Sequence, residues 1–486
     1  MNKAAGSAAL IAALAVSAVL PYLIQLGYHA MDPEVLVICA AAAGAGFGLG
    51  WLTRNWARLY SALAAFLVYW IIDAYFANTL WTIPMAAVAG LIAYILLRGR
   101  FGANVRAMLA AFSLFWIASN VLTPPLPLLK DDSIAAETPV VANPSAPPVV
   151  HVIFDELMSP TAVADGFPQG DHPAAHLIGD LVSRGFEVHT DVRSNAELTR
   201  ISVTSLFGLM KSKENWQDGP NPFTMSVKDN AYLRDLRDKG YAVTVYESNY
   251  IRLCSGTPGE TCYTYSRNGN GHAYSAITDD ILARVTFALV ELDNHLSNAS
   301  VNGTVGVYIL AKQLAIRLGW PLQPSDYYST PAAMLSVLDD VETKLRNIKH
   351  GEAVIVHVLL PHAPYILDQT CKPRAPALWS RGRRPERPVA GTTTQIYADY
   401  WDQVGCMSRH LQRLLDTTLA SEAGRDAVIM LHGDHGARVT FTLDKPSDLL
   451  QTMFAVRDGR EARGSIEPAA ASLQDLFAQT VRSRIP

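Results

Sequence analysis

The first quarter of the chain is a succession of long apolar runs with few charges between them. The runs occupy about residues 7–27, 34–53, 57–76, 79–97 and 105–122. Each is close to the ~20 residues that a helix needs to cross a bilayer. Buried helices of a soluble protein are the alternative, but five successive runs of this kind are rarely a soluble core. We therefore predict a transmembrane domain of five helices over residues 1–122.

From residue 149 onward the pattern changes to short β-branched runs that alternate with helical spacing. Strands are predicted at 149–155, 186–192, 241–248, 352–360 and 426–436. Helices are predicted at 174–185, 199–210, 232–240, 331–351 and 397–419. Strands that alternate with helices indicate a mostly parallel sheet covered on both faces. The fold class is thus a five-helix transmembrane domain followed by an α/β domain, which we expect over residues 150–486.

Composition separates the two parts further. Only nine charged residues fall within 1–122, although the chain has 40 Lys and Arg and 44 Asp and Glu. The segment 123–149 contains seven prolines and is predicted to be an extended linker. The net charge of −4 argues against a nucleic-acid partner, since such proteins normally carry a basic surplus.

The charges between the apolar runs predict the orientation in the membrane. Every Lys and Arg of the first 122 residues lies before the first run, or at the junctions between the second and third and between the fourth and fifth runs. Positive charge is concentrated in cytoplasmic loops. We therefore expect a multi-pass protein of a bacterial inner (cytoplasmic) membrane, with a cytoplasmic N-terminus and the α/β domain outside the cytoplasm. Disulfides form in such a compartment, and the sequence offers the pairs Cys254–Cys262 and Cys371–Cys406, with free buried thiols as the alternative.

Acidic and imidazole side chains follow three of the predicted strands. Asp155 and Glu156 end the first, His362 follows another, and the run His432-Gly433-Asp434-His435-Gly436 ends a third. Sites in parallel sheets form at the carboxyl ends of strands. An Asp after a strand can also be merely a turn former or helix cap. Together, these side chains predict a nitrogen and oxygen site for one divalent metal, Zn²⁺ or Mn²⁺.

Thr199 is the candidate nucleophile. It begins a predicted helix, where unpaired backbone N–H groups attract an anionic ester. The alternative is that Thr199 only caps the helix. Ser202 and Ser205 are expected to lie deeper in the helix and to reach a cleft less readily.

The motifs VIFDE, TRISVTSLF, LPHAPY and HGDHG resemble, in order and rough spacing, those of the alkaline phosphatase/sulfatase superfamily. With the predicted membrane helices, the chain resembles the bacterial membrane branch that includes phosphoethanolamine transferases and lipoteichoic acid synthases. The resemblance implies that Thr199 is the nucleophile and also touches the metal, and that His362 contacts the substrate phosphate or leaving group. It implies His432 and Arg438 as further substrate contacts. The implied metal ligands are Glu156, Asp155, Thr199, Asp434 and His435.

The function implied is a metal-dependent transferase. It would move a phospholipid-derived phosphoryl head group, of the phosphoethanolamine or phosphoglycerol type, to an envelope glycan or lipid through phospho-threonine. A sulfatase-like hydrolase of sulfate or phosphate esters is one alternative, although the sulfatase nucleophile motif is not visible in the chain. The other is a non-catalytic membrane sensor or scaffold that keeps the fold.

The segment 272–320 matches none of these motifs. Its two amphipathic helical patterns suit either a membrane interface or helices packed on the sheet. We expect the second.

Overall fold

The computed structural model divides the chain into two compact units. The first comprises Met1–Leu126 and Asn268–Ser329, and the second Pro127–Arg267 and Thr330–Pro486. The structure describes residues 3–75, 82–99, 102–124, 127–133, 142–159, 173–209, 214–218, 224–266, 271–298, 330–375, 378–379, 392–437, 439 and 449–486.

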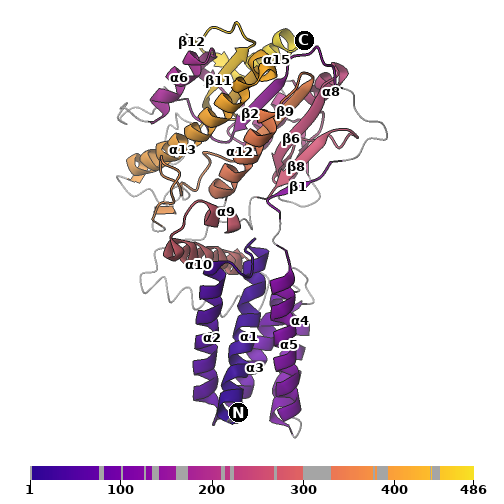
Figure 1. The fold of residues 1–486 in the computed structure, drawn as a ribbon, viewed down its shortest axis with the longest axis vertical. Coiled ribbons are helices and arrows are strands. Elements are labelled where there is room, and N and C mark those ends of the chain that lie inside the picture. The colour runs from indigo at the N-terminus through magenta and orange to yellow at the C-terminus, as the bar shows by residue number, and fades with distance from the viewer. Residues whose placement is uncertain are drawn as a thin grey trace. The chain divides into compact units, whose positions relative to one another are not determined.

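The first unit contains the five apolar helices expected from the sequence (Figure 1). They are α1 (Lys3–Gln25), α2 (Pro33–Thr53), α3 (Ala57–Tyr75), α4 (Thr82–Arg98) and α5 (Gly102–Leu122). Three of them, α1, α2 and α5, are long and apolar enough to cross a membrane, while the apolar parts of α3 and α4 are shorter. Small residues let α1 and α2 approach closely, because a side chain at Gly46 or Gly50 would lie 2.9 Å from a backbone Cα of α1.

Two further helices of the first unit come from the middle of the sequence. These are α9 (Gly271–Ala276) and α10 (Ile281–Asn298). We expected this segment to pack on the sheet, and for its first pattern that expectation is wrong: α10 contacts α2, α9 and α1. The second pattern, over 305–320, lies outside the described residues. An amphipathic pattern predicts that a helix covers an apolar surface, but it does not say which one.

The second unit is an α/β domain around a ten-stranded sheet, in the order β1-β8-β6-β9-β2-β10-β11-β3-β12, with β13 also paired to β3. Its bounds are β1 (Leu129–Asp131), β2 (Val149–Phe154), β3 (Glu187–Arg193), β6 (Ala242–Ser248), β8 (Thr261–Tyr265), β9 (Glu352–Val358), β10 (Val428–Gly433), β11 (Gln451–Asp458), β12 (Ser465–Glu467) and β13 (Ala471–Ser472). β1 and β11 run antiparallel to their neighbours, and the other pairings are parallel. The mostly parallel sheet expected from the sequence is therefore confirmed.

Helices cover both faces of this sheet. α7 (Thr199–Phe207), α8 (Ala231–Asp238) and α15 (Leu473–Arg484) pack their apolar side chains on one face, against alternate residues of the central strands. α6 (Pro173–Ser183), α12 (Thr330–Arg346) and α13 (Thr392–Ala420) lie on the other (Figure 1). The short helix α14 (Glu422–Asp426) precedes β10, and a separate small sheet joins β4 (Trp216–Asp218), β5 (Met225–Val227) and β7 (Ile251–Arg252).

Part of the proline-rich stretch expected to be a linker belongs to the α/β unit. Leu129–Asp131 forms the edge strand β1, which pairs with β8. Further along, the N–H of Asn143 donates to the carbonyl of Gly240 at 2.9 Å. Residues 127–133 and 142–149 of this stretch thus belong to the α/β unit.

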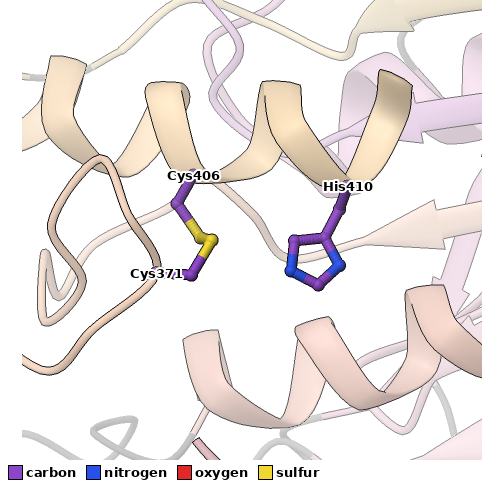
Figure 2. Close-up of side chains that lie close together, drawn as sticks. All are labelled: Cys371, Cys406 and His410. Carbon is purple, nitrogen blue, oxygen red and sulfur yellow. A yellow bond between two sulfur atoms is a disulfide. The ribbon is translucent and has the colours of Figure 1, made fainter. Parts of the chain in front are cut away.

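Both cysteine pairs expected from the sequence form disulfides. Cys254–Cys262 closes a short loop, with a sequence separation of 8. Cys371–Cys406 spans 35 residues and ties the loop after β9 to α13 (Figure 2). His410 lies one turn beyond Cys406 on the same helix.

Candidate active site

The candidate site lies where three adjacent parallel strands end. β9, β2 and β10 are neighbours in the sheet, with Val358, Phe154 and Gly433 in register. The ladder continues one step further, because the N–H of Asp155 donates to the carbonyl of Val358 and that of Asp434 to the carbonyl of Phe154. The chain segments that carry the expected site residues are therefore held side by side by backbone hydrogen bonds.

Asp434 is fixed by two of these segments at once. Its Oδ1 accepts the backbone N–H of Glu156 at 3.0 Å and that of His435 at 2.8 Å. Its Oδ2 is buried and accepts no hydrogen bond from the described residues. One oxygen thus anchors the carboxylate, and the other is left available to a ligand.

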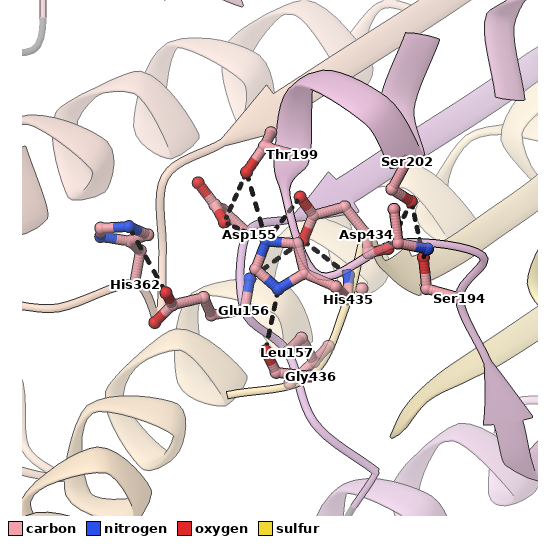
Figure 3. Close-up of polar contacts among 12 residues, drawn as sticks. Asp155, Glu156, Leu157, Ser194, Thr199, Ser202, His362, Asp434, His435 and Gly436 are labelled. Atoms are coloured by element: carbon pink, nitrogen blue, oxygen red, sulfur yellow. Dashed lines mark hydrogen bonds and ion pairs between the residues drawn. The ribbon is translucent and has the colours of Figure 1, made fainter. Parts of the chain in front are cut away.

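The hydroxyl of Thr199 faces this cluster rather than its own helix. Leu198, with an extended backbone, occupies the cap position of α7 and makes no side-chain cap. The Thr199 Oγ1 instead donates to Asp155 Oδ1 at 3.3 Å and lies 3.3 Å from His435 Nε2 (Figure 3). Thr199 is therefore not the helix cap, and its hydroxyl belongs to the cluster.

The imidazole of His435 is oriented by a backbone carbonyl. Its Nδ1 is 2.8 Å from the carbonyl oxygen of Gly436 and so carries the proton. The lone pair of a neutral ring then lies on Nε2, which is 3.4 Å from Asp434 Oδ2 and 3.7 Å from Asp155 Oδ1. A carbonyl that fixes the ring in this way is typical of metal-binding histidines.

His357 completes the cluster, and we did not predict it from the sequence. Its ring lies on β9, and one ligand atom each from Asp155, His357 and Asp434 lie within 4.8 Å of one another. Neither ring nitrogen has a hydrogen-bond partner among the described residues. Burial lowers the pKa of His357 to about 4, so the ring is neutral and can offer a lone pair. The sequence signal that could have identified His357 is a single polar residue in the otherwise apolar run VIVHVLL.

Glu156 and His362 form a second pair beside this cluster. Glu156 adopts a left-handed backbone, with φ of 63°. Its Oε1 lies 3.5 Å from His362 Nε2 (Figure 3). Of the two acidic residues after β2, Asp155 therefore faces Thr199 and Glu156 faces His362.

The remaining expected contacts lie elsewhere. His432 is fully buried on the core face of β10, with its Nε2 2.8 Å from His151 Nε2 and its ring packed on Phe454 and Phe477. Alternation along the strand turns it into the core, away from the carboxyl edge of the sheet. Arg438 lies outside the described residues.

The hydroxyl of Ser202 is already engaged. It donates to the carbonyl of Asp434 at 2.6 Å and accepts from Ser194 Oγ at 2.8 Å. This side chain supports the segment that carries Asp434.

Two buried side chains of α13 hold the loops from below. Tyr400 binds the backbone of the loop after β2, through Glu156 and Met158. Gln403 binds the loop after β9: its Oε1 accepts from Ile366 and Leu367, and its Nε2 donates to the carbonyls of Pro361 and His362. A single helix thereby fixes Glu156 and His362 relative to each other.

Close approach of the backbone leaves no room beside the strand that carries Asp434. A side chain at Gly433 would collide with the carbonyl of Leu157 and the hydroxyl of Thr452. These two atoms are themselves hydrogen-bonded at 2.7 Å. Glycine is therefore required at this position by packing.

The donor set fits a divalent cation. Carboxylates from Asp155 and Asp434 and neutral imidazoles from His357 and His435 are ligands that Zn²⁺ and Mn²⁺ accept. The buried atoms without hydrogen bonds, Asp434 Oδ2 and both His357 nitrogens, are the expected signature of such a site.

No family model matches the chain, and no curated protein sequence matches it. Among solved structures, it is similar to the phosphonate monoester hydrolase of Agrobacterium radiobacter, with 13% identity, a TM-score of 0.43, and 68% of this chain and 72% of that chain covered. It is also similar to the zinc complex of the C-terminal periplasmic domain of EcEptC from Escherichia coli, with 14% identity, a TM-score of 0.39, and 74% and 86% covered. A third similar structure is the C-terminal periplasmic domain of the phosphoethanolamine transferase EptC from Campylobacter jejuni. Its identity is 10% and its TM-score 0.37, and the match covers 69% of this chain and 88% of that chain. Because these scores and identities are low, we base the chemistry on the geometry of the site.

Proposed function

We propose that the chain is a membrane-anchored, metal-dependent transferase that uses Thr199 as its nucleophile. It takes a phosphoryl head group, of the phosphoethanolamine or phosphoglycerol type, from a phospholipid and passes it to an envelope glycan or lipid outside the cytoplasm. The observation that carries the proposal is the Thr199 hydroxyl, which lies 3.3 Å from both Asp155 Oδ1 and His435 Nε2 at the N-terminus of α7.

The proposed reaction has two steps. In the first, the Thr199 oxygen attacks the head-group phosphorus, its P–O bond forms, and the bond to the diacylglycerol oxygen breaks. In the second, an acceptor hydroxyl attacks phospho-Thr199 and regenerates the free threonine. The first backbone N–H groups of α7 stabilise the negative charge of the phosphoryl oxygens in both steps.

A divalent cation, when bound, supplies positive charge that favours the ionised threonine and neutralises the phosphoryl oxygens. Asp155, Asp434, His357 and His435 would hold it. His362 stands on the other side of Asp155-Glu156, held by the Glu156 carboxylate at 3.5 Å. We assign it the protonation of the departing diacylglycerol oxygen.

The membrane assignment rests on the apolar helices and the charge pattern. Within the part of the chain that the structure describes, three helices are long and apolar enough to span a bilayer. Lys and Arg fall between alternate runs, and both cysteine pairs are disulfides. We propose an inner-membrane, multi-pass protein whose α/β unit lies outside the cytoplasm, near its lipid donor.

Mass spectrometry of the protein isolated from its native membrane tests the chemistry. We expect a mass adduct on Thr199 that corresponds to phosphoethanolamine or phosphoglycerol. Thr199→Ser should still form the adduct, and Thr199→Ala should lose both the adduct and turnover. An active Thr199→Ala variant contradicts the proposal. An adduct that is released to water as fast as to any acceptor would make the protein a hydrolase instead.

A further inference from the structure

Helix α10 is attached to the ends of the apolar helices by its neighbouring turn and by its own side chains. The N–H of Gly271 donates to the carbonyl of Leu26, just beyond the end of α1, at 2.8 Å. Within α10, Phe287 and Ala288 are fully buried, and Leu292 packs on Tyr22 in the last turn of α1. Figure 1 shows α10 crossing the ends of α1 and α2 rather than running along them.

A buried ion pair fixes the position of α10 along the axis of α2. Arg284 Nη2 lies 2.7 Å from Glu34 Oε2, and Glu34, in the first turn of α2, has no exposed surface. Ser275, on α9, donates to the other carboxylate oxygen. A buried charge is tolerated only when it is paired and hydrogen-bonded in this way. The pair therefore holds α10 at the first turn of α2, where the apolar span begins.

Another face of α10 is an exposed apolar stripe. Ile281, Leu282 and Leu289 are 43%, 72% and 42% exposed, and Val285 lies between them. Residues at these spacings share one face of a helix. Apolar side chains are also exposed at the start of α2, since Met31, Leu36 and Val37 lie within three residues of Glu34.

We propose that α10 lies in the plane of the membrane at its outer surface, with this stripe buried in the bilayer. The bilayer is the occupant because the ion pair with Glu34 holds α10 at the end of the apolar span of α2, where the apolar side chains of α2 are themselves exposed. An amphipathic helix in this position buries its apolar face about 5–10 Å into the boundary between head groups and acyl chains. The inference rests on the membrane assignment of the proposed function, but not on its chemistry.

Spin-label accessibility in the full chain tests this placement. The protein is reconstituted in vesicles of phosphatidylethanolamine and phosphatidylglycerol, with Cys39→Ala as background, because the other four cysteines are in disulfides. Labels are attached in turn to Leu282→Cys and Leu289→Cys. Leu114→Cys on α5 is the lipid reference, and Glu461→Cys in the α/β unit is the water reference. The measurement is collision of each label with oxygen and with a water-soluble nickel chelate.

We expect the labels at 282 and 289 to be accessible to oxygen and protected from nickel, at a depth of about 5–10 Å. Labels at 282 and 289 that behave like Glu461→Cys would overturn the inference, and so would labels shielded from both reagents, which would indicate a protein partner on the stripe. The label at 114 separates the two proposals. If it reports water, the membrane assignment fails; if it reports lipid while 282 and 289 report water, only the placement of α10 fails.

Discussion

The phenol of Tyr400 donates a hydrogen bond of 2.8 Å to the backbone carbonyl of Glu156. The phenol oxygen of Tyr400 also accepts a hydrogen bond from the N–H of Met158, at 2.8 Å. All three groups are buried, so no water replaces these contacts if the hydroxyl is removed. The loop that presents Asp155 and Glu156 thus depends on one side chain of α13.

Tyr400→Phe should therefore reduce both stability and activity. Leaving a buried backbone group unpaired costs about 1–3 kcal/mol. We expect this loss in the unfolding free energy and a lower kcat for release of diacylglycerol from phospholipid vesicles. Tyr241→Phe is the matched control, because its phenol donates to the carbonyl of Pro147 at 3.0 Å, outside the site. Equal kcat values for the two folded variants would show that Tyr400 does not position the site.

His357→Phe should weaken metal binding while the fold is retained. The ring lies within 4.8 Å of the Asp155 and Asp434 carboxylates and is neutral, so its loss removes one ligand. We expect the affinity for Zn²⁺ or Mn²⁺ to fall by at least the ~10–100-fold typical of a lost supporting contact. Competition with a chromogenic chelator measures it.

His189→Gln provides the control for this prediction. His189 lies on β3, where its Nε2 is 2.9 Å from Glu187. The His189→Gln variant should bind metal with the affinity of the unmodified chain. If His357→Phe also retains full affinity, His357 is a core histidine and not a ligand.

The buried imidazole of His151 should make the protein less stable in mild acid. Burial, aided by His432 and His357 on the adjacent strands, holds the pKa of His151 well below its ordinary value of 6.5. Below pH 6.5 the unfolded chain binds a proton that the folded chain excludes. The neutral His151 therefore does not reduce the free energy of unfolding above pH 6.5. Below pH 6.5 the free energy of unfolding falls by up to about 1.4 kcal/mol per pH unit for one such group.

Unfolding of the full chain in detergent, followed from roughly pH 7.5 to roughly pH 5, measures this dependence. His151→Phe keeps an aromatic ring between Phe207 and Phe477 and should flatten the slope by one proton. A change in stability at every pH with an unchanged slope would mean that His151 does not contribute to it.

The two disulfides should differ in their effect on stability. A disulfide stabilises a fold by restricting the unfolded chain, and the effect grows with loop length. The expected stabilisation is about 4 kcal/mol for the separation of 35 residues and about 2.5 kcal/mol for the separation of 8. Cys371→Ser should therefore lower the unfolding temperature more than Cys254→Ser. It should also lower activity, because Cys371 belongs to the loop that carries His362. The reverse order would indicate that strain or residual structure, rather than loop length, dominates.

The sequence predicted the architecture well because its main signals are local. Apolar runs predicted the five helices, and alternating strands and helices predicted the central part of the sheet. β11 was not predicted, since an antiparallel strand inserted between β10 and β3 breaks the alternation of strand and helix. The surface on which α10 packs could not be predicted either, because an amphipathic helix has the same sequence pattern whether it packs on a sheet or on other helices.

Within the site, the sequence identified the strand ends but not the directions of the side chains. Asp434 and His435 lie together as expected, and Thr199 joins them. His432 differs because it still belongs to β10 and turns into the core. His357 escaped notice because a histidine inside an apolar strand is typical of a core residue, and only its contacts with Asp155 and Asp434 suggest otherwise.

The path of the chain has a practical consequence for anyone who wants the α/β unit in soluble form. Because Asn268–Ser329 belongs to the first unit, removal of the N-terminal helices alone would leave α9 and α10 without the surface they cover. The side of α10 that packs on α1 and α2 would then be exposed and would promote aggregation. A well-behaved soluble version should begin near residue 127 and should also replace 268–329 with a short polar bridge.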